Sequence, residues 1–215
     1  MRIGFVSRSD VGAFLKSYEG ERADAFVFGF NGTGQVSYEK ELDGETNRFE
    51  EAAMLSSKYK CVVVSGCVTD TRGHKRRSAV VAENGRLIGV TDLTRVIDGD
   101  TGGGAFLRVY ETKIGRIGVA VGDDLRFFEV FRALSDCGAE YIVCPVERIR
   151  EIETVLARAY AYSCGTPIAL CAEGYAVVAG TDGKLVFASP TSPAFAQMEV
   201  LKEYHLVEIR RRFTR

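Results

Sequence analysis

The sequence is poor in the residues and patterns that mark several common kinds of site. It has only two histidines, His74 and His205, and its six cysteines form no CxxC pair. Since a structural zinc site is built from closely spaced Cys and His ligands, we expect no metal centre of that kind. No apolar run approaches the length of a membrane span, and no apolar signal-peptide segment follows Met1. These absences favour a cytoplasmic protein that makes no contact with a membrane.

Charge of either sign is not in excess. The 28 Lys and Arg residues are balanced by 29 Asp and Glu residues, which leaves a formal net charge of −1. Such a chain is not attracted to nucleic acid as a whole. The basic residues at 74–77 and 210–212 have no stacking aromatics or nucleic-acid motif beside them, so we interpret them as a solvated turn and a solvated tail. We therefore expect no nucleic-acid partner.

What is present is typical of a globular protein. The chain has 215 residues, of which 46% are hydrophobic and 27% are charged. A chain of this length can bury roughly 70% of the surface that it exposes when unfolded. The sequence has no repeat, linker or shift in composition, which predicts a single domain over residues 1–215. The cysteines lie mostly in apolar runs and are interpreted as reduced, buried thiols.

Apolar, β-branched runs predict many short strands. Two of the connections carry hairpin signals, at Asn84-Gly85 and at Asp182-Gly183. Strands are expected at residues 2–7, 25–30, 61–68, 78–83, 86–90, 106–111, 116–121, 141–144, 167–171, 175–181, 185–188 and 204–209.

Apolar residues at helical spacing predict a smaller number of amphipathic helices. One follows the capping residue Asp10, and another runs to about residue 60 from a capping box made by Asn47 and Glu50. A helix at 125–137 can be capped by the aspartates at 123 and 124, and a further helix is expected at 149–163. The intervening polar or irregular segments are at residues 31–34, 70–77, 94–104 and 190–193.

Residues 117–145 organise the rest of the chain. A buried strand breaks at Gly122, an amphipathic helix follows, and a second buried strand ends in Pro145. This order is typical of a strand–helix–strand unit, and ligands in open α/β sheets bind beyond the carboxyl ends of such strands. Residues 122–124 and 144–147 therefore border the expected pocket.

This segment resembles the nitrilase (carbon–nitrogen hydrolase) superfamily. The family pattern is an apolar strand, Cys-Tyr-Asp, a helix opening with Arg-Phe-Pro-Glu, and a Gly-Ala-Glu turn into a strand ending in Pro. The resemblance continues to about Gly183 and implies an α/β (α+β) fold, in which two mixed sheets form an αββα sandwich with outer helices. It also implies a homodimer. The residues in register are Asp124, Arg126, Phe127, Glu129, Phe131, Arg132, Gly138, Ala139, Glu140 and Pro145.

The resemblance implies a Cys nucleophile, a Glu base and a Lys that stabilises the tetrahedral intermediate. The matching positions in this chain are occupied by Gly122, Phe30 and Leu93. These side chains cannot attack a carbon atom, accept a proton or carry positive charge. The sequence therefore predicts a nitrilase-like pseudoenzyme that needs no cofactor and binds a small molecule or a protein partner.

The alternative hypothesis is an active amide or nitrile hydrolase with relocated chemistry. Cys144 ends the strand next to that of Gly122, and Asp123 or Glu147 could serve as its base. Against this, a cysteine in an apolar strand is far more often a core residue, and no nearby His or Lys would lower its pKa. A metal ion at Asp123 and Asp124 is also disfavoured, because two adjacent carboxylates alone do not make a Mg²⁺ site.

The pocket implied by both hypotheses is expected to be apolar in part, enlarged at Gly122, and negatively charged through its aspartates at 92, 123 and 124. We therefore expect weak binding of cationic or neutral small molecules in preference to carboxylates. A subunit interface is expected on the helix at 149–163 and around residues 128–131. The predicted pocket residues are Phe30, Asp92, Leu93, Gly122, Asp123, Cys144 and Glu147.

Overall fold

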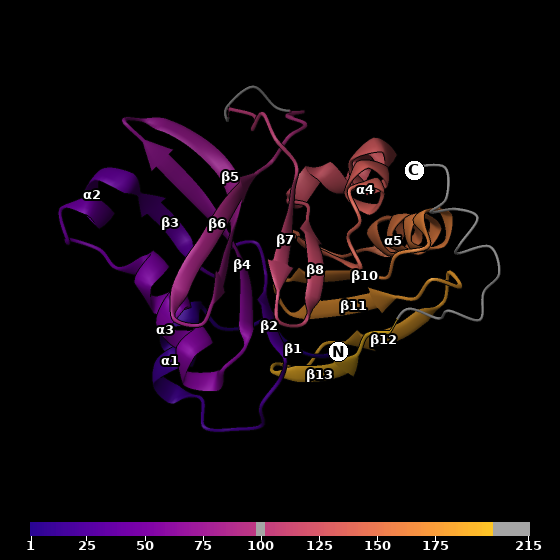
Figure 1. Cartoon of the computed structure of the whole chain (residues 1–215), viewed down its shortest axis with the longest axis horizontal. Helices are drawn as coiled ribbons and strands as arrows, with labels where there is room; N and C mark the ends of the chain where they lie inside the picture. The colour runs from indigo at the N-terminus through magenta and orange to yellow at the C-terminus, as the bar shows by residue number, and fades with distance from the viewer. Residues whose placement is uncertain (98–101, 200–215) are drawn as a thin grey trace.

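The computed structural model of the protein describes residues 1–97 and 102–199. Two β-sheets lie face to face in the middle of the molecule, and helices cover the outer face of each sheet (Figure 1). The sandwich of two mixed sheets with outer helices that the sequence predicts is therefore confirmed.

Within the described residues, the first sheet has seven strands. They are β1 (Arg2–Val6), β2 (Ala25–Phe28), β3 (Gly34–Ser37), β4 (Val62–Thr71), β5 (His74–Glu83), β6 (Arg86–Asp92) and β13 (Ala194–Gln197). Their order is β13-β1-β2-β4-β5-β6, and β3 pairs with the outer part of β4. Because β1, β2 and β4 are parallel, their carboxyl ends meet at one edge of the sheet.

The second sheet has six strands in the described part of the chain. They are β7 (Arg108–Thr112), β8 (Gly115–Val119), β9 (Tyr141–Pro145), β10 (Ile168–Ala172), β11 (Tyr175–Ala179) and β12 (Leu185–Ser189). Their order is β12-β11-β10-β9-β8-β7, with β8, β9 and β10 parallel. The expected strand–helix–strand unit is therefore present, and its carboxyl ends lie beside those of β1 and β2.

The alternation of side chains along each strand divides the core into three apolar layers. On β4, Val62 and Val64 lie in the layer between the sheets, whereas Val63 lies in the layer under the helices. The elements outside the sheets are α1 (Val11–Ser17), α2 (Tyr38–Leu42), α3 (Arg48–Tyr59), the 3₁₀ helix η1 (Gly122–Arg126), α4 (Phe128–Asp136) and α5 (Glu151–Cys164).

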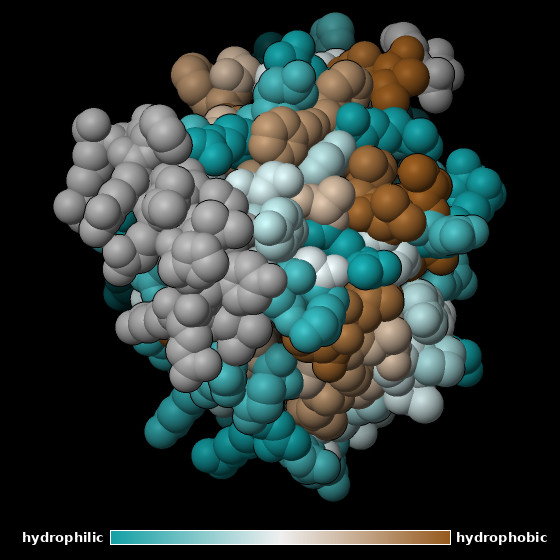
Figure 2. All heavy atoms as spheres, turned by 90° about the vertical axis from the view of Figure 1, so that its right-hand side faces the viewer, coloured by the Kyte–Doolittle hydropathy of each residue, from teal (hydrophilic) through white to brown (hydrophobic). Residues whose placement is uncertain are grey.

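Helices α1 and α3 pack on the first sheet, and α4 and α5 pack on the second, each through one apolar face. On the side of the molecule where α4 and α5 lie, hydrophobic side chains form patches between polar ones (Figure 2). None of the helices in the described ranges is long and apolar enough to cross a membrane.

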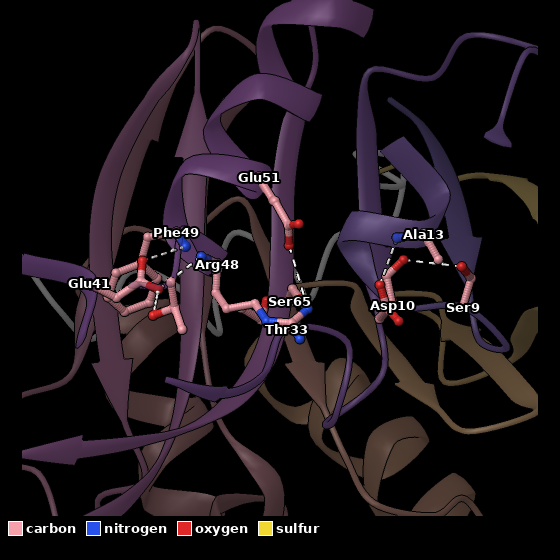
Figure 3. A network of polar contacts seen from close by, with 10 residues as sticks. Ser9, Asp10, Ala13, Thr33, Glu41, Arg48, Phe49, Glu51 and Ser65 are labelled. Atoms are coloured by element: carbon pink, nitrogen blue, oxygen red, sulfur yellow. Dashed lines mark hydrogen bonds and ion pairs between the residues drawn. The ribbon is translucent and has the colours of Figure 1, made fainter. Parts of the chain in front are cut away.

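Several local signals in the sequence are confirmed. Asp10 caps α1, because its Oδ1 accepts a hydrogen bond of 2.7 Å from the backbone N–H of Ala13 (Figure 3). Asn84 and Gly85 have φ of +52° and +76°, as a tight hairpin turn between β5 and β6 requires. Gly138, with φ +84°, follows the end of α4.

The expected capping box at the start of α3 is wrong. The box predicted from the sequence consists of Asn47 and Glu50. In the structure, the side chain of Asn47 makes no hydrogen bond to the first turn of the helix. Glu41 of α2 supplies the acceptor in their place. Its carboxylate accepts from the backbone N–H of Arg48 at 2.9 Å and from that of Phe49 at 3.1 Å (Figure 3). A helix start can thus be satisfied by a side chain outside the local sequence pattern.

The predicted polar loop at 70–77 is also wrong, because it forms a β-hairpin. The strands β4 and β5 continue through it and turn at Arg72 and Gly73, which have φ of +53° and +84°. Most side chains of this extension are exposed, so it lacks the apolar alternation that identifies a strand. The elements β3, α2 and β13 were not expected. The predicted strand at 204–209 and tail at 210–212 lie outside the described residues.

Candidate functional site

The chain turns sharply after β8, at an elbow formed by Gly122. This residue has φ +53°, in the left-handed region that glycine adopts without steric strain. It is buried, and η1 begins at it. A Cβ atom at this position would lie 3.8 Å from the ring of Phe30, which is an ordinary contact distance. The elbow therefore has room for a small side chain, although its backbone conformation favours glycine.

Three chain segments meet at this end of the layer between the sheets. Phe30 follows β2, Leu93 follows β6, and Gly122 follows β8. Phe30 and Leu93 are buried members of one core cluster, which also includes Val121 next to the elbow. The structure thus brings together the three positions at which the sequence analysis expected substituted catalytic residues.

The side chain of Asp124 ties the loop after β6 to the elbow. It is fully buried, and its Oδ1 accepts from the N–H of Thr94 at 3.0 Å, from the hydroxyl of Thr94 at 2.7 Å and from the N–H of Arg95 at 3.1 Å. Its Oδ2 accepts from the N–H of Val121 at 3.3 Å. Burial raises the pKa of Asp124, and the hydrogen bonds oppose this rise. The expectation that an aspartate caps the following helix is wrong, because α4 begins without a side-chain cap.

Arg77, on β5, links the two sheets beside the elbow. Its Nη1 donates to Oδ2 of Asp123 at 3.0 Å, and its Nη2 lies 3.2 Å from Oε1 of Glu147. Its guanidinium carbon lies 5.8 Å from the centre of the Phe30 ring, within the range of a cation–π contact. Asp123 is shared between two cations, because its Oδ1 accepts from Nε of Arg126 at 3.0 Å. Charges of opposite sign therefore alternate around the elbow.

Arg77 is not among the predicted site residues, because its sequence neighbourhood at 74–77 is typical of a solvated turn. In the structure, the carbonyl of Arg77 accepts from the N–H of Leu93 at 2.7 Å, which places it next to the loop that Asp124 holds. Since β5 is antiparallel to β4, the beginning of β5 lies at the carboxyl end of β4. The apolar run at 78–83 could have indicated this position of Arg77. A strand that begins a few residues before this run places Arg77 at that edge of the sheet.

One cavity adjoins the elbow, and a second lies on the far side of Glu147 beside Phe30. The smaller has a volume of about 250 Å³, and Gly122, Leu125 and Val146 are among its lining residues. The larger has a volume of about 510 Å³ and lies at the carboxyl ends of β1 and β2, where it is bordered by Phe30. Glu147 lines both cavities.

The smaller cavity does not have the negative charge that the sequence analysis expected. Asp92 lines neither cavity, since it pairs with Arg76 at 3.1 Å and accepts from the hydroxyl of Ser78 at 2.7 Å. Asp124 is enclosed by its backbone donors. The expectation failed because arginines from distant segments balance the carboxylates. The charged residues that line the cavity are Arg77, Arg126, Arg148, Asp123, Glu147 and Glu153.

Cys144 lies in the layer between the second sheet and the helices α4 and α5, where it is fully buried. Its neighbour on β9, Val143, lies in the layer between the sheets. Burial raises the pKa of the Cys144 thiol well above its ordinary value, and the charge of Asp124 raises it further. Cys144 is therefore not among the residues that line the two cavities, whereas Asp123 and Glu147 both line the smaller one.

Similarity to known proteins was found at two levels. A profile of the carbon–nitrogen hydrolase family matches residues 24–205 of the chain. No curated protein is significantly similar to the chain in sequence.

Solved structures share the fold at low sequence identity. Nit3 of Saccharomyces cerevisiae, a member of branch 10 of the nitrilase superfamily, is 17% identical with a TM-score of 0.77, over 96% of this chain and 93% of that chain. An amidase from Nesterenkonia sp. is 16% identical with a TM-score of 0.73, over 99% and 96%. A variant of the Nesterenkonia sp. AN1 amidase in complex with butyramide is 15% identical with a TM-score of 0.73, over 91% and 88%. At these identities the likeness establishes the fold.

Proposed function

The chain belongs to the carbon–nitrogen hydrolase family, and from that premise we propose that it has lost the family's hydrolytic triad and binds a small molecule beside the elbow. The observation that carries this proposal is that Gly122 lies next to the ring of Phe30. A Cβ atom built on Gly122 would be 3.8 Å from the nearest ring atom. Where the family's mechanism needs a thiolate next to a carboxylate, this chain has a bare backbone next to an aromatic ring.

None of the three catalytic roles can be filled by the side chains at these positions. Gly122 has no side-chain atom that could form a covalent intermediate, and Phe30 cannot accept a proton. Leu93 is buried and uncharged, so it cannot stabilise an oxyanion. Loss of the nucleophile alone lowers the kcat of a serine protease by roughly 10⁶-fold. Substitution of all three groups is therefore expected to leave no useful rate.

The proposal is tested by an assay for hydrolysis. Purified protein is incubated with a series of primary amides and nitriles that includes butyramide, and the release of ammonia is measured. We expect no release above the uncatalysed rate. A turnover of about 1 s⁻¹ or more, which is ordinary for an enzyme, would overturn the proposal.

The alternative is hydrolysis by relocated groups, with Cys144 as nucleophile and Asp123 or Glu147 as base. The raised pKa and complete burial of Cys144 weigh against it. The chain contains its own control, because Cys137 is exposed. We expect a thiol-alkylating reagent to modify Cys137 rapidly and Cys144 slowly. Rapid alkylation of Cys144, with amide hydrolysis that Cys144→Ala abolishes, would favour the alternative.

We also propose that the protein forms a homodimer through the face made by α4 and α5. Large apolar side chains on this face are exposed, with 38% of Phe128, 52% of Ile152 and 46% of Val155 accessible to solvent. Exposed apolar patches on one face favour contact with another protein. We expect scattering to give the mass of two chains, and Ile152→Glu to give the mass of one. A monomeric wild-type protein would contradict this proposal.

A further inference from the structure

Arg77 has two partners that differ in how firmly they hold it. Asp123, which binds Nη1, belongs to the elbow and is itself fixed by Arg126, and its side chain is 28% exposed. Glu147, which approaches Nη2, lies on the segment after β9, and its side chain is 49% exposed. An exposed ion pair contributes only about 0–1 kcal/mol. Glu147 is therefore the partner that another anion could replace.

The guanidinium of Arg77 is held in place without Glu147. The hydrogen bond to Asp123 fixes one edge of the guanidinium. The centre of the Phe30 ring lies 5.8 Å from the guanidinium carbon. A planar guanidinium that is held in this way presents its second edge in a fixed direction, and this geometry suits a carboxylate. A preorganised cation also loses less conformational freedom when it binds a ligand.

The cavity in front of Arg77 is small, and its walls combine charged side chains with an apolar part. Its volume is about 250 Å³, which suits a ligand of a few heavy atoms. Gly122 contributes no side chain to this space. The apolar residues that line the cavity are Ile97, Leu125, Val146 and Leu156.

From this arrangement we propose that the cavity binds a short-chain organic carboxylate. The carboxylate takes the place of Glu147 on Nη2 of Arg77, and the hydrocarbon chain lies against Leu125 and Val146. The inference rests on the proposed function, which is binding without hydrolysis. In an active hydrolase, a carboxylate in this cavity would be the product of the reaction and not a ligand in its own right. The inference reverses the expected preference for cationic or neutral molecules over carboxylates, because the sequence did not reveal Arg77 at this site.

The experiment compares three probes of the same shape and different charge: butyrate, butyramide and butylammonium. Calorimetry or ligand-observed NMR measures their Kd for the purified 215-residue chain. Butyrate is expected to bind most tightly, and raised salt is expected to weaken its binding. Tighter binding of butylammonium or butyramide, or no detectable binding of butyrate, overturns the inference. Release of ammonia from butyramide would instead overturn the proposed function, so the two failures are distinguishable.

Variants assign the effect to Arg77. A hydrogen bond to a charged group contributes about 1.5–3 kcal/mol, so Arg77→Gln should raise the Kd of butyrate by about ten- to hundredfold. Arg77→Lys keeps the charge but not the planar fork, and should fall between Gln and the wild type. The matched control is Arg76→Gln, because Arg76 is the preceding residue on β5 and pairs with Asp92 outside the cavity. An equal effect of the Arg76 and Arg77 variants overturns the inference.

The variant Glu147→Gln gives a readout of opposite sign. Removal of the competing carboxylate should lower the Kd of butyrate by up to about fivefold. If the ion pair only stabilised the structure, Glu147→Gln would bind butyrate more weakly than the wild type or not at all. The control is Glu173→Gln, since Glu173 lines only the larger cavity. Circular dichroism confirms that each variant is folded, and weaker binding of butyrate by Glu147→Gln would overturn the inference.

Discussion

Asp123 and Asp124 are neighbours in the chain, yet the elbow places them in different environments. Asp124 is fully buried and accepts hydrogen bonds from the backbone of residues 94–95. Asp123 is partly exposed and faces the ion pair of Arg77 with Glu147. We call the first arrangement the inner side of the elbow and the second its outer side.

The difference shows how a scaffold can be separated from a binding surface across one peptide bond. A buried carboxylate that satisfies several backbone donors fixes the course of the chain, and its removal leaves those donors unpaired. An exposed carboxylate between two arginines contributes little to stability and can take part in recognition. Because the inner side alone shapes the elbow, the fold can persist when the groups on the outer side change.

The largest expected effect comes from breaking the inner side. Asp124→Ala leaves the buried N–H group of Val121 and the partly buried N–H groups of Thr94 and Arg95 without their acceptor. Each unpaired group costs about 1–3 kcal/mol, so we expect the free energy of unfolding to fall by about 3 kcal/mol or more. Asp123→Ala, the matched change on the outer side, should lower it by less than about 1 kcal/mol. Urea unfolding measures both, and equal losses would abolish the distinction between the two sides.

A smaller effect is expected at the residue that joins the two sides. Gly122→Ala places a Cβ atom at φ +53°, and a left-handed conformation costs a residue with a side chain about 1–2 kcal/mol. The nearest atom of Phe30 would be 3.8 Å away, so no steric clash adds to this cost. Gly174→Ala is the control, because Gly174 has φ +72° and nothing within 4 Å of its Cβ position. A much greater loss at position 122 than at 174, by thermal or urea unfolding, would show that the elbow has no spare room.

Much of the fold could be predicted because apolar runs and turn residues act locally. The strand at 25–30, the helix after Asp10 and the turn at Asn84-Gly85 each follow from a few adjacent residues. The segments that were missed depend on distant partners. β3 gains its backbone hydrogen bonds from β4, and the start of α3 takes its acceptor from Glu41.

The candidate site was less predictable for two physical reasons. In a strand with apolar residues throughout, the alternation does not say which face points to which layer, so the side of β9 on which Cys144 lies was not determined. The side-chain partners of Arg77 are 46 or more residues away along the chain, and only the paired sheets bring them together. The strand–helix–strand unit at 117–145 could be predicted, and it correctly placed the elbow at the carboxyl end of its first strand.

The smallest expected effect is a dependence of stability on pH that belongs to the inner side alone. Burial raises the pKa of Asp124 in the folded protein, whereas in the unfolded chain an aspartate titrates near about 3.9. The folded state then binds this proton more tightly. The contribution of Asp124 to stability is therefore greatest below the unfolded pKa and falls as the pH rises through the folded pKa.

The variant Asp124→Asn removes this titration. The free energy of unfolding, measured from about pH 3 to about pH 7, should give a difference between wild type and variant that declines with rising pH. Asp123→Asn should leave the decline in place, because Asp124 is intact. A difference that rises with pH would mean that the hydrogen bonds from the four donor groups around Asp124 outweigh its burial. The donors on the inner side would then stabilise the ionised form of Asp124. In that respect the inner side would resemble the outer side, where Asp123 pairs with arginines.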